Sequence, residues 1–93
     1  MKYRSRMDIA AAMLETALEG ANKTNVMYRS FLSFPQLKEY LAVLTDRGLL
    51  EYEEKDKEYV TTESGKRFLK VYKEIGQLIF PKGSKVPPWM VEA

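Results

Sequence analysis

The side chains best suited to chemistry in this 93-residue chain are polar groups between positions 23 and 38. Gln36 carries the donor and acceptor that pair with an adenine edge, and Lys38 can donate to guanine or to a phosphate oxygen. Lys23 and Arg29 would neutralise phosphate charge, and Thr24 adds a hydroxyl donor. These residue types indicate recognition of nucleic acid through hydrogen bonds and charge.

Other kinds of chemistry lack their usual residues. Histidine and cysteine are both absent, which excludes histidine-based catalysis, cysteine nucleophiles and His/Cys zinc sites. The sequence has no glycine-rich phosphate loop and no cluster of carboxylates at metal-ligand spacing. We therefore expect no enzymatic activity, no catalytic residues, no metal and no cofactor.

A well-bounded helix at 33–47 carries two of the polar candidates. Ser33 and Gln36 form a capping box at its start, and Gly48 supplies a left-handed stop at its end. Its apolar residues recur at i, i+4 and i+7, which predicts one buried face. These residues are Leu37, Leu41 and Leu44, with Tyr40 beside them.

A shorter helix, from Thr24 to Phe31, is predicted just upstream and is capped by either Asn22 or Thr24. A turn at Leu32 and Ser33 joins the two helices, a spacing typical of a helix-turn-helix whose second helix recognises DNA. Three apolar side chains of the helix from Thr24 to Phe31 are expected to pack inward: Val26, Met27 and Phe31. A buried ring is also the preferred interpretation for Tyr28.

Residues 50–61 alternate apolar and charged side chains on either side of a turn at 54–57, which predicts a β-hairpin. Following the recognition helix, this hairpin would be a wing. Lys55 and Lys57 are its candidate DNA contacts. The segment 49–61 also holds five acidic residues, which makes the wing a poor groove probe.

Helices are also predicted at both ends of this unit. Ser5 caps a first helix that contributes an apolar stripe to the core and ends at Gly20, and Thr62 caps a last helix over 63–79. Apolar side chains cover roughly half of the last helix, more than one core requires, with a coiled-coil spacing. We expect antiparallel dimerisation through it; a larger core of its own domain is the alternative. The dimerisation residues are Phe68, Val71, Tyr72, Ile75, Leu78 and Ile79.

The sequence predicts one domain over residues 1–80, including the last helix, and a proline-rich tail over 81–93. An unattached tail is the preferred interpretation, with docking of a protein partner around Trp89 as the alternative. No apolar run approaches the roughly 20 residues that cross a bilayer, and the N-terminus lacks the apolar segment of a signal peptide. We expect a cytoplasmic, nucleoid-associated protein with no membrane partner.

The predicted element order is that of a winged helix-turn-helix, mainly α with a small β-hairpin (α+β). Three stretches resemble the small archaeal winged-helix DNA-binding proteins of the ten-kilodalton chromatin class and related archaeal regulators. They are RSRMDIAAAMLE, KTNVMYRSFLSFPQLKEYLAVLTDRGLLE and YVTTESGKRFLK, within residues 4–72. The resemblance implies double-stranded DNA as partner and a homodimer joined by antiparallel last helices. By position it implies the contact set Lys23, Thr24, Arg29, Ser33, Gln36 and Lys38.

These observations together predict a dimeric transcriptional regulator that reads DNA with helix 33–47 and the wing. The net charge of only +2 favours this function over an architectural chromatin protein, which would bind without sequence preference. A second alternative is a protein-interaction module, in which the last helix and Trp89 bind a partner and the acidic wing keeps DNA away.

Overall fold

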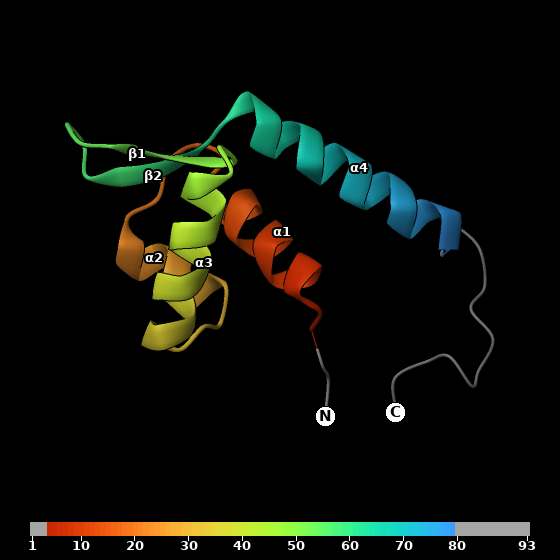
Figure 1. Ribbon diagram of the computed structural model, residues 1–93, viewed down its shortest axis with the longest axis horizontal. Coiled ribbons are helices and arrows are strands. Elements are labelled where there is room, and N and C mark those ends of the chain that lie inside the picture. The colour runs from red at the N-terminus through yellow and green to blue at the C-terminus, as the bar shows by residue number, and fades with distance from the viewer. Residues whose placement is uncertain (1–3, 80–93) are drawn as a thin grey trace.

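Residues 4–79 are described by the computed structural model, and they form the predicted order of elements. Figure 1 shows a unit of three helices, a hairpin that projects from it, and a last helix that runs past one side. The elements are α1 (Arg6–Thr16), α2 (Lys23–Arg29), α3 (Phe34–Asp46), β1 (Leu50–Glu53), β2 (Glu58–Thr61) and α4 (Glu63–Ile79). This arrangement confirms the predicted mainly α fold with a small hairpin. The tail at 81–93, with Trp89, lies outside the described residues.

The helices begin at residues that the sequence predicts as caps. Ser5 Oγ accepts a hydrogen bond from Asp8 N at 3.0 Å, and the Asp8 carboxylate accepts one from Ser5 N at 3.0 Å. Ser33 caps α3 with the same reciprocal arrangement. For α2, the sequence allows either Asn22 or Thr24 as the cap. In the structure Asn22 is the cap, and Thr24 lies inside the helix. Each cap satisfies N–H groups that have no partner within the helix.

The predicted end of α1 at Gly20 is wrong, because the helix stops at Thr16. The Ala17 carbonyl accepts hydrogen bonds from Gly20 N at 3.1 Å and from Thr61 N at 3.0 Å. These bonds close a turn and attach it to β2, and Gly20 then redirects the chain with a φ of +95°. A long-range contact with the hairpin therefore ends α1 earlier than its apolar pattern predicts.

The wing is a two-stranded antiparallel hairpin in which Tyr52 lies opposite Tyr59. A third segment joins it at one point, since Ala21 N donates to the Tyr59 carbonyl at 3.0 Å and Tyr59 N donates to the Ala21 carbonyl at 2.7 Å. This bridge fixes the start of α2 beside β2. The polar residues at the start of α2 are thereby brought close to the wing.

The core is centred on α1, with contributions from α2, α3, β1 and α4. Its largest fully buried apolar side chains are Met13, Leu14, Leu37, Leu50 and Val26. Tyr40 is buried, as the predicted face of α3 requires. Leu69 brings α4 into the core, whereas the end of α4 extends beyond α1 (Figure 1).

The expected burial of Phe31 and Tyr28 is wrong, because their exposed fractions are 82% and 67%. The helix ends at Arg29, and Phe31 then adopts a left-handed backbone with a φ of 55°. This turn points Leu32 into the core in place of Phe31. The Arg4 guanidinium donates a hydrogen bond to the Phe31 carbonyl at 3.0 Å, which ties the N-terminal segment to the turn between α2 and α3.

The close approach of α4 to the loop before the wing gives a first prediction. A Cβ atom at Gly65 would overlap the Leu49 carbonyl oxygen and lie 2.5 Å from Thr61 Cγ2. Gly65→Ala is expected to lower the free energy of unfolding by about 1–3 kcal/mol, because these atoms must move apart. Gly76→Ala, in the same helix with open space around it, is expected to raise it by about 0.5–1 kcal/mol. Urea unfolding of both variants checks this; equal effects would contradict it.

Candidate nucleic-acid interface

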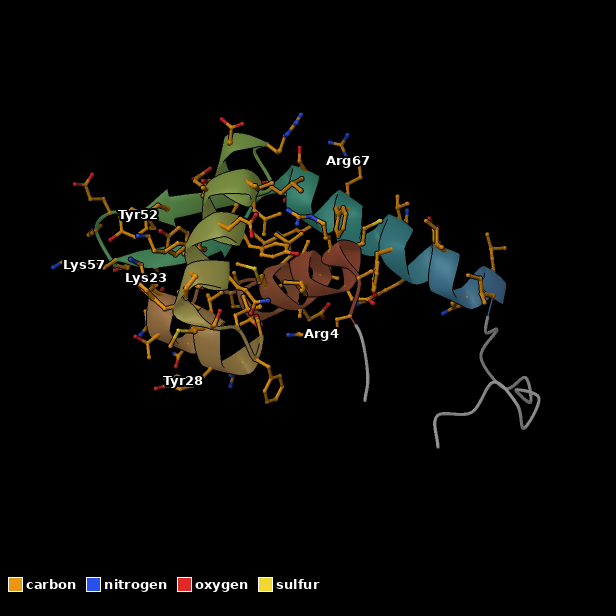
Figure 2. The ribbon with its side chains drawn as sticks, turned by 60° about the horizontal axis from the view of Figure 1, so that its bottom comes forward. Arg4, Lys23, Tyr28, Tyr52, Lys57 and Arg67 are labelled. Carbon is orange, nitrogen blue, oxygen red and sulfur yellow. The ribbon has the colours of Figure 1, made fainter. Side chains whose placement is uncertain are left out.

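A basic pocket lies where α2, α3 and the wing meet. Its volume is about 250 Å³, and Lys23, Lys38 and Tyr59 line it together with Leu41, Ala42 and Thr45 of α3. The bridge between Ala21 and Tyr59 brings Lys23 to this place, while the α3 helix presents Lys38. Figure 2 shows Lys23 beside the hairpin, with Lys57 at the hairpin's tip. Two of the predicted contact residues therefore line one site.

An aromatic ring lies close to the ammonium groups of both lysines. Phe34 is the first residue of α3 and is 53% exposed. The Lys23 Nζ atom lies 6.0 Å from its ring centroid, and the Lys38 Nζ atom lies 5.5 Å from it. Both distances allow a favourable interaction of the ammonium group with the ring. We call these residues the Lys23–Phe34–Lys38 cluster.

Tyr59 adds a hydroxyl group to the pocket. Its ring centroid lies 5.0 Å from that of Tyr52 on the opposite strand. Burial, followed by the interaction with Tyr52, raises the pKa of Tyr59 above its ordinary value of 10.0. The hydroxyl therefore stays protonated at neutral pH and can donate a hydrogen bond to an anion.

The two faces of the wing differ in chemistry, because successive side chains of a strand point to opposite faces. Tyr52 and Tyr59 share a face with the buried Leu50, whereas Glu53 and Glu58 pair on the other face. The acidic side chains of the strands thus lie on the face away from the tyrosines. Lys55 and Lys57, the predicted wing contacts, are exposed in the turn between the strands, next to Glu54 and Asp56.

Gln36 is exposed, but its amide oxygen already accepts hydrogen bonds within the protein. This oxygen accepts a hydrogen bond from Ser33 N at 3.1 Å and lies 3.2 Å from Ser33 Oγ, which can donate to it. An adenine edge needs both the oxygen and the NH₂ group of a glutamine. The predicted adenine contact would therefore require Gln36 to leave the cap of α3. Ser33 is engaged in the same cap.

The remaining predicted contacts lie apart from the cluster. Thr24 is exposed in the first turn of α2, and Arg29 is exposed in its last turn. Neither residue lines the basic pocket. The structure therefore brings together Lys23 and Lys38, and it adds two residues that were not predicted, Phe34 and Tyr59.

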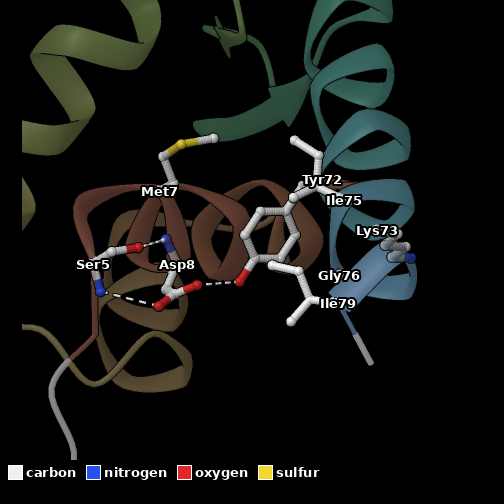
Figure 3. Close-up of a pocket in the computed structure, with 8 residues that line it drawn as sticks. All are labelled: Ser5, Met7, Asp8, Tyr72, Lys73, Ile75, Gly76 and Ile79. Carbon is white, nitrogen blue, oxygen red and sulfur yellow. Dashed lines mark hydrogen bonds between the residues drawn. The ribbon is translucent and has the colours of Figure 1, made fainter. Parts of the chain in front are cut away.

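The predicted dimerisation residues divide into two groups on α4. Phe68 and Tyr72 are half-buried and pack against the core of their own chain. The other four are exposed: Val71, Ile75, Leu78 and Ile79. Ile75, Ile79 and Tyr72 line a pocket of about 420 Å³ between α4 and the start of α1, next to Met7 and Asp8. Figure 3 shows both isoleucines beside Tyr72.

A polar contact closes one side of this pocket. The Tyr72 hydroxyl donates a hydrogen bond to Asp8 Oδ1, and Ser5 N donates to the other carboxylate oxygen (Figure 3). The bond from Tyr72, and then the bond from Ser5, hold the pKa of Asp8 below its ordinary value of 3.8. This contact joins α4 to the cap of α1.

The lowered pKa gives a prediction about acid stability. A carboxyl group whose pKa is lower in the folded chain stabilises the fold above its unfolded pKa, and the contribution is lost as the pH falls through the folded pKa. Tyr72→Phe is expected to lower the melting temperature at neutral pH, and the difference from the parent should shrink below about pH 3.8, the unfolded value. Thermal melts across this range check it, with Tyr28→Phe at an exposed position as control. Parallel pH profiles for parent and Tyr72→Phe would contradict it.

No helix within residues 4–79 combines the length and hydropathy needed to cross a membrane. In the same part of the chain, no group of three acidic side chains is placed to hold a metal ion.

Comparison with known proteins gives a family. The sequence profile described as winged helix-turn-helix matches residues 3–80. Among solved structures, one similar chain is Sso10a-2, described as a DNA-binding protein from Sulfolobus solfataricus, with 22% identity and a TM-score of 0.69. The match covers 97% of this chain and 100% of that chain, and it confirms the resemblance to small archaeal winged-helix proteins. No curated protein matches. Because the profile spans most of the sequence, the chain belongs to the winged helix-turn-helix family.

Proposed function

We propose that the protein is a dimeric transcriptional regulator, associated with the nucleoid, that binds double-stranded DNA with α3 in the major groove. The observation that carries this proposal is the Lys23–Phe34–Lys38 cluster. Lys23 and Lys38 come from different helices, yet both ammonium groups lie within 6.0 Å of one ring centroid. Two exposed cations held beside one ring at the start of α3 are suited to adjacent phosphates or a base edge.

The placement of the wing supports the same function. Tyr52 and Tyr59 face the side on which the basic pocket lies, and the acidic residues of the strands face the other way. Repulsion between the wing and DNA is therefore reduced on the side that α3 presents. The similarity to Sso10a-2, which is described as DNA-binding, also supports DNA as the partner.

The low net charge of the chain favours a regulator over an architectural protein. The net charge is +2, and binding by charge alone would call for a more basic surface. In the proposed regulator, phosphate contacts orient α3 and base contacts supply the sequence preference.

Fluorescence-anisotropy titration tests this function with the whole chain. Binding of a random-sequence duplex is compared with binding of a pool selected for affinity, each at low and near-physiological salt. Tighter binding of the pool that persists at the higher salt would support the regulator. Equal binding that collapses with salt would indicate an architectural protein. No binding to either duplex would overturn the DNA function and favour a protein-interaction module.

A further inference from the structure

We propose that Phe34 contacts the 5-methyl group of thymine in the major groove and so contributes to sequence preference. This inference rests on the proposed DNA-binding function. Phe34 stands at the first position of α3, and all residues from 33 to 36 are exposed. The start of the recognition helix is the part that approaches base edges in this class of proteins.

The ring of Phe34 has no structural task that explains its exposure. It is 53% exposed and is not among the side chains of the core or those packed against it. An isolated exposed apolar side chain is common on protein surfaces. Phe34 differs from such a residue because Lys23 Nζ and Lys38 Nζ both lie over its ring, at 6.0 and 5.5 Å.

The groups that base pairs present in the major groove determine what such a ring can contact there. Each base pair presents donors and acceptors there, and the thymine methyl is the apolar group among them. Lysines that bind phosphate oxygens would draw the ring of Phe34 towards the base edges. The polar reader predicted nearby, Gln36, has its amide oxygen engaged by Ser33. Phe34 and Pro35 are both exposed in this turn, and the ring of Phe34 offers the larger apolar surface to a base edge.

The test uses duplexes that differ only in methyl groups. Binding of the whole protein to an alternating A·T duplex is compared with binding to the same duplex in which uracil replaces thymine. The parent protein is expected to bind the uracil duplex about fourfold more weakly, the effect of about one buried methyl group. Phe34→Ala should bind both duplexes equally, and Phe34→Leu should keep part of the preference.

Val43→Ala provides a matched control. Val43 is also an exposed apolar residue of α3, and it lies nine positions further on, half a turn round the helix from Phe34. This variant is expected to keep the full preference of the parent for thymine. Each variant is expected to fold, because the cap residues of α3 are unchanged. Circular dichroism and thermal melting check this.

The outcomes separate the two proposals. Equal binding of thymine and uracil duplexes by the parent would overturn the role of Phe34 and leave DNA binding intact. A preference for thymine that persists in Phe34→Ala would overturn it as well. Failure of the parent to bind either duplex would overturn the role of Phe34, and failure to bind the selected pool as well would overturn the DNA-binding function.

Discussion

Replacing Lys23 and Lys38 together by alanine is expected to weaken binding to duplex DNA by roughly a hundredfold at low salt. A hydrogen bond that involves a charged group contributes about 1.5–3 kcal/mol, and 1.4 kcal/mol corresponds to tenfold in affinity. Both side chains are exposed and line the basic pocket. Their removal should leave the core unchanged, so the loss would appear in binding rather than in stability.

The salt dependence of binding separates phosphate contacts from base contacts. Each neutralised phosphate adds about 0.9 to the slope of log K against log salt concentration. If Lys23 and Lys38 each bind one phosphate, the double variant should lose about 1.8 from this slope for each protomer in contact with DNA. Anisotropy titrations at several salt concentrations measure the slope. If Lys38 reads a guanine instead, the slope falls less and the preference among sequences relaxes.

A second double variant controls for net charge. Lys66→Ala with Lys70→Ala removes the same charge from α4, on exposed positions that do not line the basic pocket. This variant is expected to lose less than threefold in affinity, because only the general field of the protein changes. Equal losses for the two double variants would contradict a localised site and would indicate binding by overall charge.

Local signals in the sequence predicted most of the elements. The capping boxes at Ser5 and Ser33 and the stop at Gly48 are each made by residues close together in the chain, so the sequence alone determines them. The hairpin turn and the whole span of α4 were predicted for the same reason. The alternation of Tyr52 and Tyr59 with charged residues also predicted the strands.

Contacts between distant residues could not be predicted in this way. The bridge between Ala21 and Tyr59 places Lys23 in the basic pocket, and no periodic pattern reports it. The hydrogen bond between Asp8 and Tyr72 joins residues 64 positions apart. Both contacts follow from how the elements pack, which a reading of local patterns does not determine.

Phe34 shows how a pattern can mislead. It precedes Leu37 by three positions and Leu41 by seven, so periodicity alone assigns it to the buried face of α3. The start of α3 instead lies at the edge of the core, so Leu37 is buried but the ring of Phe34 is 53% exposed. A burial pattern predicts which face of a helix is apolar, but it does not predict where along the helix the core ends.

Replacing Ile75 and Ile79 together by glutamate is expected to break the proposed dimer into monomers. These side chains belong to an exposed apolar strip on α4 that also contains Val71 and Leu78. Leu78 is 83% exposed, and a cluster of four large exposed apolar side chains is typical of an interface. Paired with a second α4, this strip would be buried, and charges placed within it would be desolvated without a partner.

The rest of α4 shows why this strip is available. Gly65, Leu69 and Tyr72 face α1, β2 and the loop before β1 of the same chain. With 100° between successive residues of a helix, Val71, Ile75 and Leu78 lie on an adjoining face. The end of α4 also extends beyond α1 (Figure 1). Within residues 4–79, the core of the chain therefore does not cover this face.

Molar mass in solution measures the effect. The chain has a mass of 10.8 kDa, so light scattering coupled to size-exclusion chromatography should give about twice this value for the parent and this value for Ile75→Glu/Ile79→Glu. Lys70→Glu with Gln77→Glu places two glutamates on the polar face of α4 and should remain dimeric. A parent that stays monomeric over a wide concentration range would contradict dimerisation.

The monomeric variant also tests whether dimerisation matters for DNA binding. Two recognition helices on one dimer bind one duplex with an avidity that can exceed the affinity of a single unit by 10²–10⁴. Ile75→Glu/Ile79→Glu keeps Lys23, Phe34 and Lys38, so each monomer should still bind DNA, but with an affinity lower by about two orders of magnitude. If the monomeric variant binds as tightly as the parent, one winged helix is sufficient for DNA binding, and the apolar strip of α4 serves another partner.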